Sequence, residues 1–225
     1  MNLEHWTPRP RPGEATLVGE TVRLEPLDWS VHGQGLAEAV AGPANLAIWR
    51  YMPMGPFETQ EEFERGFGGI VTARQWAPLV IHHRSDDQIM GTASYMRIRE
   101  DHGSAEVGAV AFSDALKRTR LATEAMYLMA CHIFDELGYR RYEWKCHHAN
   151  GASNRAALRF GFKFEGVFRN DMVVKGRSRD TAWYAMTDDD WPHIKSGFEA
   201  WLAPENFDGV GNQHASLKDL REGRL

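Results

Sequence analysis

The chain has 225 residues, of which 43% are apolar and 25% charged, and its 26 Lys and Arg against 31 Asp and Glu give a formal charge of -5. This length predicts one domain that buries its own core without disulfides or metals. The acidic balance argues against a nucleic-acid-binding protein, because such proteins carry a broad basic surface. Two cysteines without an apolar leader argue against a secreted disulfide scaffold. No apolar run approaches the roughly 20 residues that span a bilayer. We therefore expect a cytoplasmic protein with neither nucleic acid nor membrane as a partner.

The first half of the chain alternates between proline-interrupted segments and regular apolar patterns. The periodicities, caps and turn residues predict these elements in order: a proline-rich arm (1–19), a strand (21–27) ended at Pro26, a helix capped by Asp28 or Ser30, an aromatic loop (48–57), a helix from Thr59 to about Arg74, and a hairpin (79–83 with 89–98).

The second half places helices between strands. Its patterns predict a strand (106–112), a helix (122–137) stopped by Gly138, a strand (142–146), a short helix (153–160) closed by Gly161, two strands (162–168 and 181–186) and a helical appendage (189–225) packed by aromatics. Strand-helix-strand passages put parallel neighbours in the centre of a sheet whose first half is antiparallel. We expect a single mixed α/β domain over 20–188, flanked by helices.

A basic turn joins the strand ending at Phe112 to the following helix. It carries Lys117, Arg118 and Arg120, close to the free N–H groups of a helix N-terminus. Such a turn is either an anion site suited to phosphates or a solvated basic loop, and the physics alone gives the two interpretations even weight.

The same segment resembles motif A of the GNAT acetyltransferases, whose Arg/Gln-x-x-Gly-x-Gly/Ala loop cradles the pyrophosphate of acetyl-CoA. Lys117 to Ala122 stand at those positions, and Asn150 to Ser153 followed by Gly161 resemble the family's motif B. The likeness is closer to the RimJ/RimL-type branch, through the aromatic loop, Glu106-Val-Gly and Arg177-x-Arg-Asp. It covers roughly Glu20 to Asp188.

This resemblance implies acetyl-CoA as co-substrate and a set of residues around it. The residues implied to bind it are Phe112, Ser113, Lys117, Arg118, Thr119, Arg120, Leu121, Ala122, Thr123 and Asn150. Two positions depart from the family pattern. Arg120 stands where the family has its first glycine, so its charge would have to pair with phosphate in place of a permissive backbone. Ala157 stands where many members carry a tyrosine that reprotonates the thiolate.

The implied reaction is direct attack of an amine on the thioester, with backbone N–H groups near Phe112 and Ser113 holding the oxyanion. Glu106 is the first candidate base, and an exposed strand-end carboxylate is the equally weighted alternative. His147 is the second candidate, by its titration range. Ser153 either protonates the leaving thiolate or caps its helix.

Four residues are candidates for the acceptor side: Trp49, Tyr51, Tyr95 and Arg97. Aromatic residues at such places are also typical of a packed core. The doublets His82-His83 and His147-His148 are weak metal candidates, because adjacent strand residues point to opposite faces, so we expect no metal.

Two functions follow from these observations. The first is an acetyl-CoA-dependent N-acetyltransferase acting on a small-molecule or peptide amine. The second is a GNAT-fold module that binds CoA with little or no turnover, suggested by Arg120 and Ala157. The acceptor stays open among peptide N-termini, amino acids, polyamines and antibiotic amines, and a second copy of the chain is a candidate partner.

Overall fold

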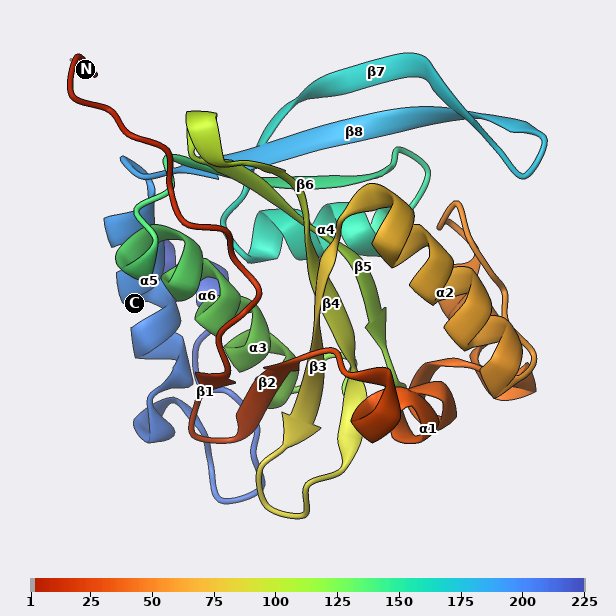
Figure 1. The fold of residues 1–225 in the computed structure, drawn as a ribbon. Coiled ribbons are helices and arrows are strands. Elements are labelled where there is room, and N and C mark those ends of the chain that lie inside the picture. The colour runs from red at the N-terminus through yellow and green to blue at the C-terminus, as the bar shows by residue number, and fades with distance from the viewer. Residues whose placement is uncertain (1–2, 225) are drawn as a thin grey trace.

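An eight-stranded sheet in the order β1-β2-β3-β4-β5-β6-β8-β7 forms the centre of this computed structural model, which describes residues 3–224 (Figure 1). The strands are β1 (Leu17–Val18), β2 (Val22–Pro26), β3 (Ala77–His83), β4 (Ile89–Arg99), β5 (Ser104–Phe112), β6 (Arg141–His147), β7 (Lys163–Val174) and β8 (Arg177–Thr187). Only β5 and β6 pair in parallel, and the other described pairs are antiparallel. The expected mixed α/β fold is confirmed.

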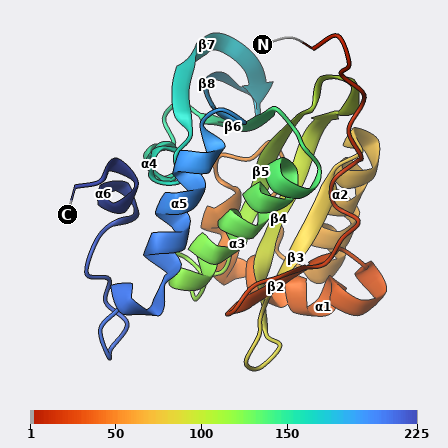
Figure 2. The same cartoon turned by 90° about the vertical axis from the view of Figure 1, so that its left-hand side faces the viewer.

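Helices cover both faces of the sheet. They are α1 (Trp29–Val40), α2 (Gln60–Arg74), α3 (Arg120–Cys131), α4 (Gly151–Arg159), α5 (Trp191–Leu202) and α6 (Leu217–Glu222), with short segments η1 (Pro43–Trp49), η2 (Glu100–His102), η3 (His132–Glu136) and η4 (Pro204–Asn206). Figure 2 shows α3 and α5 on one face, with α1 and α2 on the other. No helix in residues 3–224 is long and apolar enough to cross a membrane.

Two apolar clusters lie on the two faces. The larger lies under α3, α4 and α5 and includes Tyr95, Tyr142 and Trp144. The smaller lies under α1 and α2, where Trp49 and Phe63 pack edge to face with neighbouring aromatic rings. Burial of this apolar surface is the main favourable term that holds the helices on the sheet.

Local signals in the sequence set most element boundaries. Asp28 caps α1 by accepting from the Ser30 amide, and Thr59 caps α2 by accepting from the Glu62 amide. The expected helix over 122–137 is an α-helix only to Cys131, after which η3 continues it as a π-helical turn. The last two strands are much longer than expected and form a hairpin that projects past the rest of the sheet (Figure 1).

Segments near both ends of the described chain pack against the central domain. The Trp6 indole donates to the Asp101 carbonyl at 2.8 Å, and the Tyr139 hydroxyl donates to the Pro10 carbonyl at 3.1 Å, so the arm wraps along the domain. Aromatic side chains of α5, including Phe198, are buried in the larger cluster. Helix α5 therefore contributes to the same core as the sheet.

Candidate active site

The two parallel strands separate part of the way along their length. β5 and β6 pair from Ser104 with Arg141 to Val107 with Trp144, yet β5 continues to Phe112 and β6 to His147. Beyond the last pair, β5 has a bulge opposite β4, where Ala109 takes a φ of 48°. A bulge bends its strand. Because β4 and β6 are the described neighbours of β5, the edge of residues 108–112 that faces β6 can offer its backbone groups to a ligand.

The amides at the end of β5 point in alternate directions. The Ser113 N–H donates to the Met90 carbonyl of β4 at 3.0 Å, so the oxyanion role predicted for this amide is wrong. In an extended strand the preceding N–H points to the opposite edge. The amide of Phe112 is therefore the donor of this pair that faces the opening.

The loop after β5 leads directly into the N-terminus of α3. Thr119 caps the helix, its hydroxyl oxygen accepting from the Ala122 amide at 3.1 Å. The first amides of a helix, here those of Arg120 and Leu121, have no partner within the helix. The loop residue with a left-handed backbone is Arg118, with a φ of 64°. The first turn of α3 therefore presents backbone N–H groups of the kind that bind anions, and the loop residue in the left-handed region is Arg118, not Arg120.

The side chains of Arg120 and Thr123 are committed elsewhere. Arg120 donates to the Leu202 carbonyl at 2.6 Å and pairs with Glu20 at 3.2 Å. The Thr123 hydroxyl is buried and accepts from Arg159 at 3.0 Å. The predicted pairing of the Arg120 guanidinium with phosphate therefore does not fit the structure, and neither does a side-chain contact from Thr123. The backbone N–H of Arg120 still lies in the first turn of α3.

Motif B forms the start of α4, which follows β6. Asn150 is the N-cap, its Oδ1 accepting from the Ser153 amide at 3.2 Å. Ser153 is therefore not the cap. Its hydroxyl oxygen accepts from the Trp144 indole at 3.0 Å. A hydroxyl held in this way keeps its own proton for another acceptor.

Glu106 lies one residue before the point where the strands separate. It is 3% exposed, so the alternative of an exposed strand-end carboxylate is wrong. Lys145 Nζ lies 2.7 Å from its Oε2, and Arg97 Nε lies at 3.8 Å. Burial raises the pKa of Glu106, with Glu143 adding to the shift and Lys145 and Arg97 opposing it. A carboxylate with a raised pKa beside an opening is suited to proton transfer.

Glu143 sits directly opposite Glu106 across the parallel pair. Its Oε1 accepts hydrogen bonds from Arg99 Nη2 at 3.0 Å and from Arg141 Nε at 2.8 Å. Glu143 is therefore paired with two arginines on the side away from the opening and shares Arg97, at 3.9 Å, with Glu106, whereas Lys145 pairs with Glu106 on the side toward the opening. The two carboxylates have different surroundings, which favours Glu106 for chemistry.

His147 ends β6 next to the loop after η1. Its Nδ1 accepts from the Ala149 amide at 3.1 Å, which leaves the proton of the neutral ring on Nε2. Burial lowers the pKa of His147, as does the nearby Arg179. The ring packs against Tyr51 at 5.3 Å between centroids. A neutral ring whose free lone pair already accepts a hydrogen bond is a poor base, so Glu106 is the better candidate.

Two of the four predicted acceptor residues belong to the core. Trp49 is fully buried and donates to the Val40 carbonyl at 2.8 Å. Tyr95 is also fully buried, and its hydroxyl donates to the Met129 carbonyl at 3.0 Å under α3. Their assignment to the acceptor side is wrong. Tyr51 and Arg97 remain candidates, with Arg97 stacked 5.1 Å from the Trp183 ring beside Glu106.

A cavity of about 270 Å³ lies where the β7–β8 turn meets the segment after η1. The Lys175 ammonium closes this contact by donating to the Trp49 carbonyl at 2.9 Å. The cavity is lined by Arg50, Tyr51, His147, Val174, Lys175, Arg177, Ser178 and Arg179. It therefore adjoins the end of β6 at His147, on the side of the opening.

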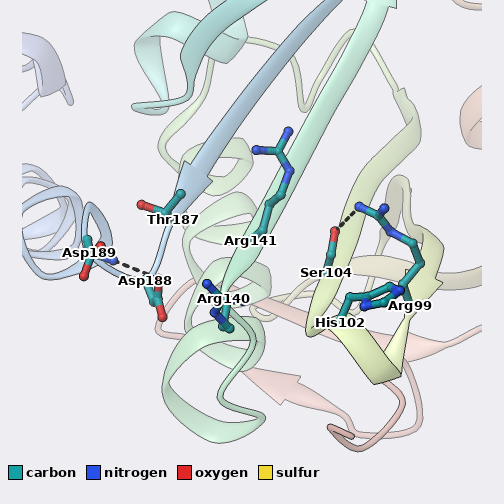
Figure 3. A pocket seen from close by; sticks show the side chains of 8 residues that line it. All are labelled: Arg99, His102, Ser104, Arg140, Arg141, Thr187, Asp188 and Asp189. Atoms are coloured by element: carbon teal, nitrogen blue, oxygen red, sulfur yellow. Dashed lines mark hydrogen bonds between the residues drawn. The ribbon is translucent and has the colours of Figure 1, made fainter. Parts of the chain in front are cut away.

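A second cavity, of about 340 Å³, lies at the opposite ends of β5 and β6 (Figure 3). Arg99, Arg140 and Arg141 line it together with Asp188 and Asp189. Two of these arginines are already engaged by Glu143, and Arg141 also pairs with Glu165. Its cations are largely balanced, and it lies away from the opening.

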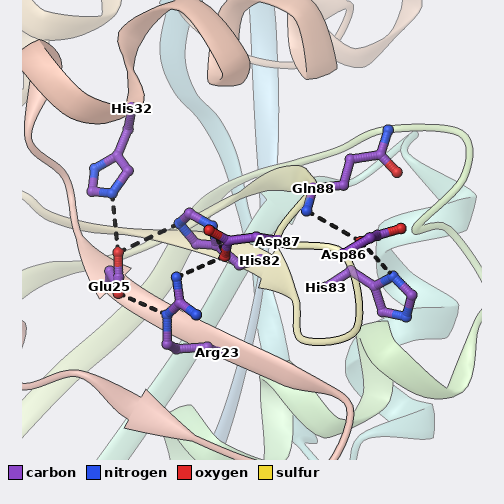
Figure 4. A network of polar contacts seen from close by, with 8 residues as sticks. All are labelled: Arg23, Glu25, His32, His82, His83, Asp86, Asp87 and Gln88. Atoms are coloured by element: carbon purple, nitrogen blue, oxygen red, sulfur yellow. Dashed lines mark hydrogen bonds and ion pairs between the residues drawn. The ribbon is translucent and has the colours of Figure 1, made fainter.

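Three residues that are distant in sequence form a cluster of metal-ligand types (Figure 4). Glu25, His32 and His82 come from β2, α1 and β3. However, His32 Nδ1 accepts from the Asp28 amide at 3.0 Å, so its Nε2 carries a proton and donates to Glu25 Oε2 at 3.1 Å. Arg23 also donates to Glu25, at 2.7 Å. Because a metal must bind a lone pair, this arrangement fits a hydrogen-bonded buried network better than a metal site.

Sequence reasoning did not find the partners of Glu106 or the basic residues of the smaller cavity. Lys145 reaches Glu106, and Trp183 lies against Lys145, through the register of β5, β6 and β8, which no local pattern reveals. Arg177 and Arg179 were visible in the sequence only as part of a hairpin motif. Two arginines at alternate positions of a strand do share a face, and that signal could have suggested a basic surface.

Known proteins match this chain over most of its length. The family model described as acetyltransferase (GNAT) domain matches residues 22–163. The crystal structure of a GCN5-related N-acetyltransferase from Brucella melitensis is 41% identical, with a TM-score of 0.92 over 98% of this chain and 100% of that one. A probable acetyltransferase of the GNAT family from Chromobacterium violaceum is 42% identical, with a TM-score of 0.79 over 85% and 96%. The uncharacterized N-acetyltransferase YoaA of Bacillus subtilis is 27% identical over 154 residues, 67% of this chain and 86% of that protein.

Proposed function

The chain belongs to the acetyltransferase (GNAT) family, and from this premise we propose that it transfers an acetyl group from acetyl-CoA to a primary amine. The observation that carries the proposal is the separation of β5 from β6 after Val107 and Trp144. It leaves an unpaired strand edge beside a helix N-terminus. A long ligand with a phosphate end and an amide-bearing arm would suit both.

The residues present fit acetyl-CoA. The first turn of α3 and the loop bearing Lys117 and Arg118 would hold the pyrophosphate through backbone N–H groups and positive charge. The free edge of β5 would pair with the amides of the pantetheine arm, as a sheet edge pairs with an added strand. Asn150 keeps its Nδ2 for the same arm, because its Oδ1 caps α4.

When bound, acetyl-CoA supplies a thioester carbonyl that an amine can attack. The Phe112 amide would donate to the carbonyl oxygen, a contribution of about 3 to 4 kcal/mol for a well-placed donor. Glu106 would take the proton of the incoming amine, through a water molecule, and pass it to solvent. Ser153, whose oxygen accepts from Trp144, would donate a hydrogen bond to the departing thiolate, which would then take its proton from solvent.

The RimJ/RimL-type branch is the proposed placement within the family. The aromatic loop, Glu106-Val-Gly and the Arg177-x-Arg-Asp hairpin support it. An acetyltransferase from Salmonella typhimurium that modifies the N-terminal serine of ribosomal protein L7/L12 has the same fold, at 21% identity and a TM-score of 0.65. That likeness speaks for the fold alone. The cytoplasm is the proposed compartment, in keeping with two cysteines that form no disulfide.

The alternative of a CoA-binding module rests now on one residue. Arg120 no longer supports it, since the left-handed position of the loop is Arg118. Ala157 still does, because it is fully buried and offers no hydroxyl for the thiolate. Ser153 is the group that would replace the missing tyrosine.

An amine panel separates the enzyme from the module. Thiol release from acetyl-CoA would be followed with peptide N-termini, amino acids, amino amides and spermidine, alongside calorimetric titration of acetyl-CoA. Acetyl-CoA binding with turnover of at least one amine supports the enzyme. Binding without turnover of any amine contradicts it and favours the module.

A further inference from the structure

The cavity at the β7–β8 turn concentrates positive charge on an acidic protein. Four of its eight lining residues are Arg50, Lys175, Arg177 and Arg179, and none is Asp or Glu. The whole chain has a formal charge of -5. A cavity of this charge on such a chain attracts anions and repels cations, because charges lining a hollow focus their field within it.

None of these four cations forms an ion pair within residues 3–224. Arg179 is only 9% exposed, and its Nε is buried without a hydrogen-bond partner among the described residues. Lys175 meets a neutral carbonyl, and Arg50 stacks on the Tyr51 ring at 5.3 Å. In the other cavity, by contrast, Arg99 and Arg141 each pair with the carboxylate of Glu143. A buried guanidinium without a carboxylate is costly unless a ligand pairs with it.

The place of the cavity ties it to the amine and not to the phosphates of acetyl-CoA. It borders His147 at the end of β6, whereas the anion-binding turn follows β5 and opens α3. Tyr51 and His147 stack at its wall. Its position fits an anionic group carried by the acceptor, near the amine that attacks.

We propose that the acceptor is a primary amine whose own molecule carries a carboxylate or phosphate close to the amine, held by the guanidinium groups of this cavity. This inference rests on the proposed function. Arginine suits such groups because its planar fork donates two parallel hydrogen bonds. Polyamines and polycationic antibiotics are excluded as substrates, since four unpaired cations would repel them.

The same charges assist the chemistry. Nearby positive charge favours the neutral form of an amine and so lowers its pKa. An acceptor anchored here would lose its proton more readily than in water. Glu106 would then need to be a less strong base, which suits a carboxylate whose negative charge Lys145 already stabilises.

Two sets of matched probes test the proposal. The first is L-serine against L-serinamide, which differ in the carboxylate. The second is Ser-Glu-Glu-amide, Ser-Gln-Gln-amide and Ser-Lys-Lys-amide, which share one N-terminal residue and differ in charge. We expect the anionic probe to exceed its neutral partner by about tenfold or more in kcat/KM in at least one set, with the lysine peptide and spermidine the poorest. A preference within the serine pair indicates a free amino acid as the acceptor, and a preference within the peptide set indicates an acidic peptide.

Variants assign the preference to the cavity. Arg177→Gln, at an exposed position, should reduce kcat/KM for the anionic probe about tenfold and for the neutral probe far less, with the Kd for acetyl-CoA unchanged. Arg65→Gln, on the exposed side of α2 and away from the cavity, is the matched control and should change neither. Raising the ionic strength should erode the preference in the wild type.

Binding distinguishes failure of this inference from failure of the proposed function. Calorimetric titration of Ser-Glu-Glu-amide and Ser-Lys-Lys-amide into the protein with CoA present reads charge selectivity without turnover. Preference for the glutamate peptide without turnover of any probe supports the anionic site and contradicts the enzyme. Turnover with equal kcat/KM for anionic and neutral probes overturns the inference and leaves the enzyme intact. Weaker acetyl-CoA binding in Arg177→Gln overturns it too, since the cavity would then belong to CoA.

Discussion

Replacing Arg120 by alanine separates structural support from cofactor binding. The guanidinium donates to the Leu202 carbonyl at 2.6 Å, pairs with Glu20 at 3.2 Å and lies 5.1 Å from the Phe207 ring. A hydrogen bond from a charged donor contributes about 1.5 to 3 kcal/mol. The ion pair with the largely exposed Glu20 adds about 0 to 1 kcal/mol, and the cation–π contact about 0.5 to 1 kcal/mol.

Together these contacts predict that Arg120→Ala lowers the free energy of unfolding by about 2 to 5 kcal/mol. For a chain of this size that is a fall in Tm of about 4 to 20 °C. The Kd for acetyl-CoA should change less than about threefold, because the backbone amides of the α3 turn remain. Thermal unfolding and calorimetric titration measure the two quantities, with Arg65→Ala as a surface control. A tenfold loss of acetyl-CoA affinity at unchanged Tm would show that the guanidinium binds phosphate and would refute this reasoning.

Four further substitutions probe the site. Glu106→Gln should lower kcat about ten- to a thousandfold without changing the affinity for acetyl-CoA. In the wild type, activity should fall as the pH decreases through the raised pKa of Glu106, at a pH above the usual glutamate range. The same fall in activity at low pH in the variant would remove Glu106 from the mechanism. Asn150→Ala should destabilise the protein by about 1 kcal/mol through loss of the α4 cap and raise the KM for acetyl-CoA more than that for the amine; an effect on the amine alone would place this turn on the acceptor side. Tyr95→Phe should lower the free energy of unfolding by about 1 kcal/mol and leave the KM for the amine unchanged. Tyr51→Ala should raise the KM for the amine. A raised KM in Tyr95→Phe with an unchanged KM in Tyr51→Ala would contradict the burial of Tyr95.

The sequence predicted the parts of the site that depend on neighbouring residues. Thr59 and Glu62 marked the start of α2, and the order of motif A and motif B located the loop before α3 and the start of α4. These features arise from caps and turns within a few residues, where side chain and backbone meet directly. Caps and turns can therefore be predicted from one sequence.

The parts that could not be predicted depend on contacts between distant segments. Arg120 finds its acceptor at Leu202, 82 residues away, and nothing near Arg120 points there. Tyr95 and Tyr51 look alike in sequence, yet the register of β4 turns Tyr95 toward α3. A shift of one residue would have exposed it on the other face. Long-range register therefore decided which predicted residues reach the opening.

The pairing of Glu106 shows the same limit at the site itself. Its Lys145 partner comes from β6, and the two meet only because β5 and β6 pair in parallel before they separate. The sequence offered two equal interpretations of Glu106, exposed carboxylate or base. Burial within a charged cluster removed the first.

Amide hydrogen exchange with and without acetyl-CoA tests the central claim, that the opening between β5 and β6 holds this co-substrate. The account predicts slower exchange on adding acetyl-CoA at residues 110–112 of β5 and at 117–122 around the start of α3. Residues in β2 and β3 should not change, and neither should those lining the cavity at Arg99 and Arg140. Protection confined to that second cavity, or no protection anywhere at saturating acetyl-CoA, would contradict the assignment of the site.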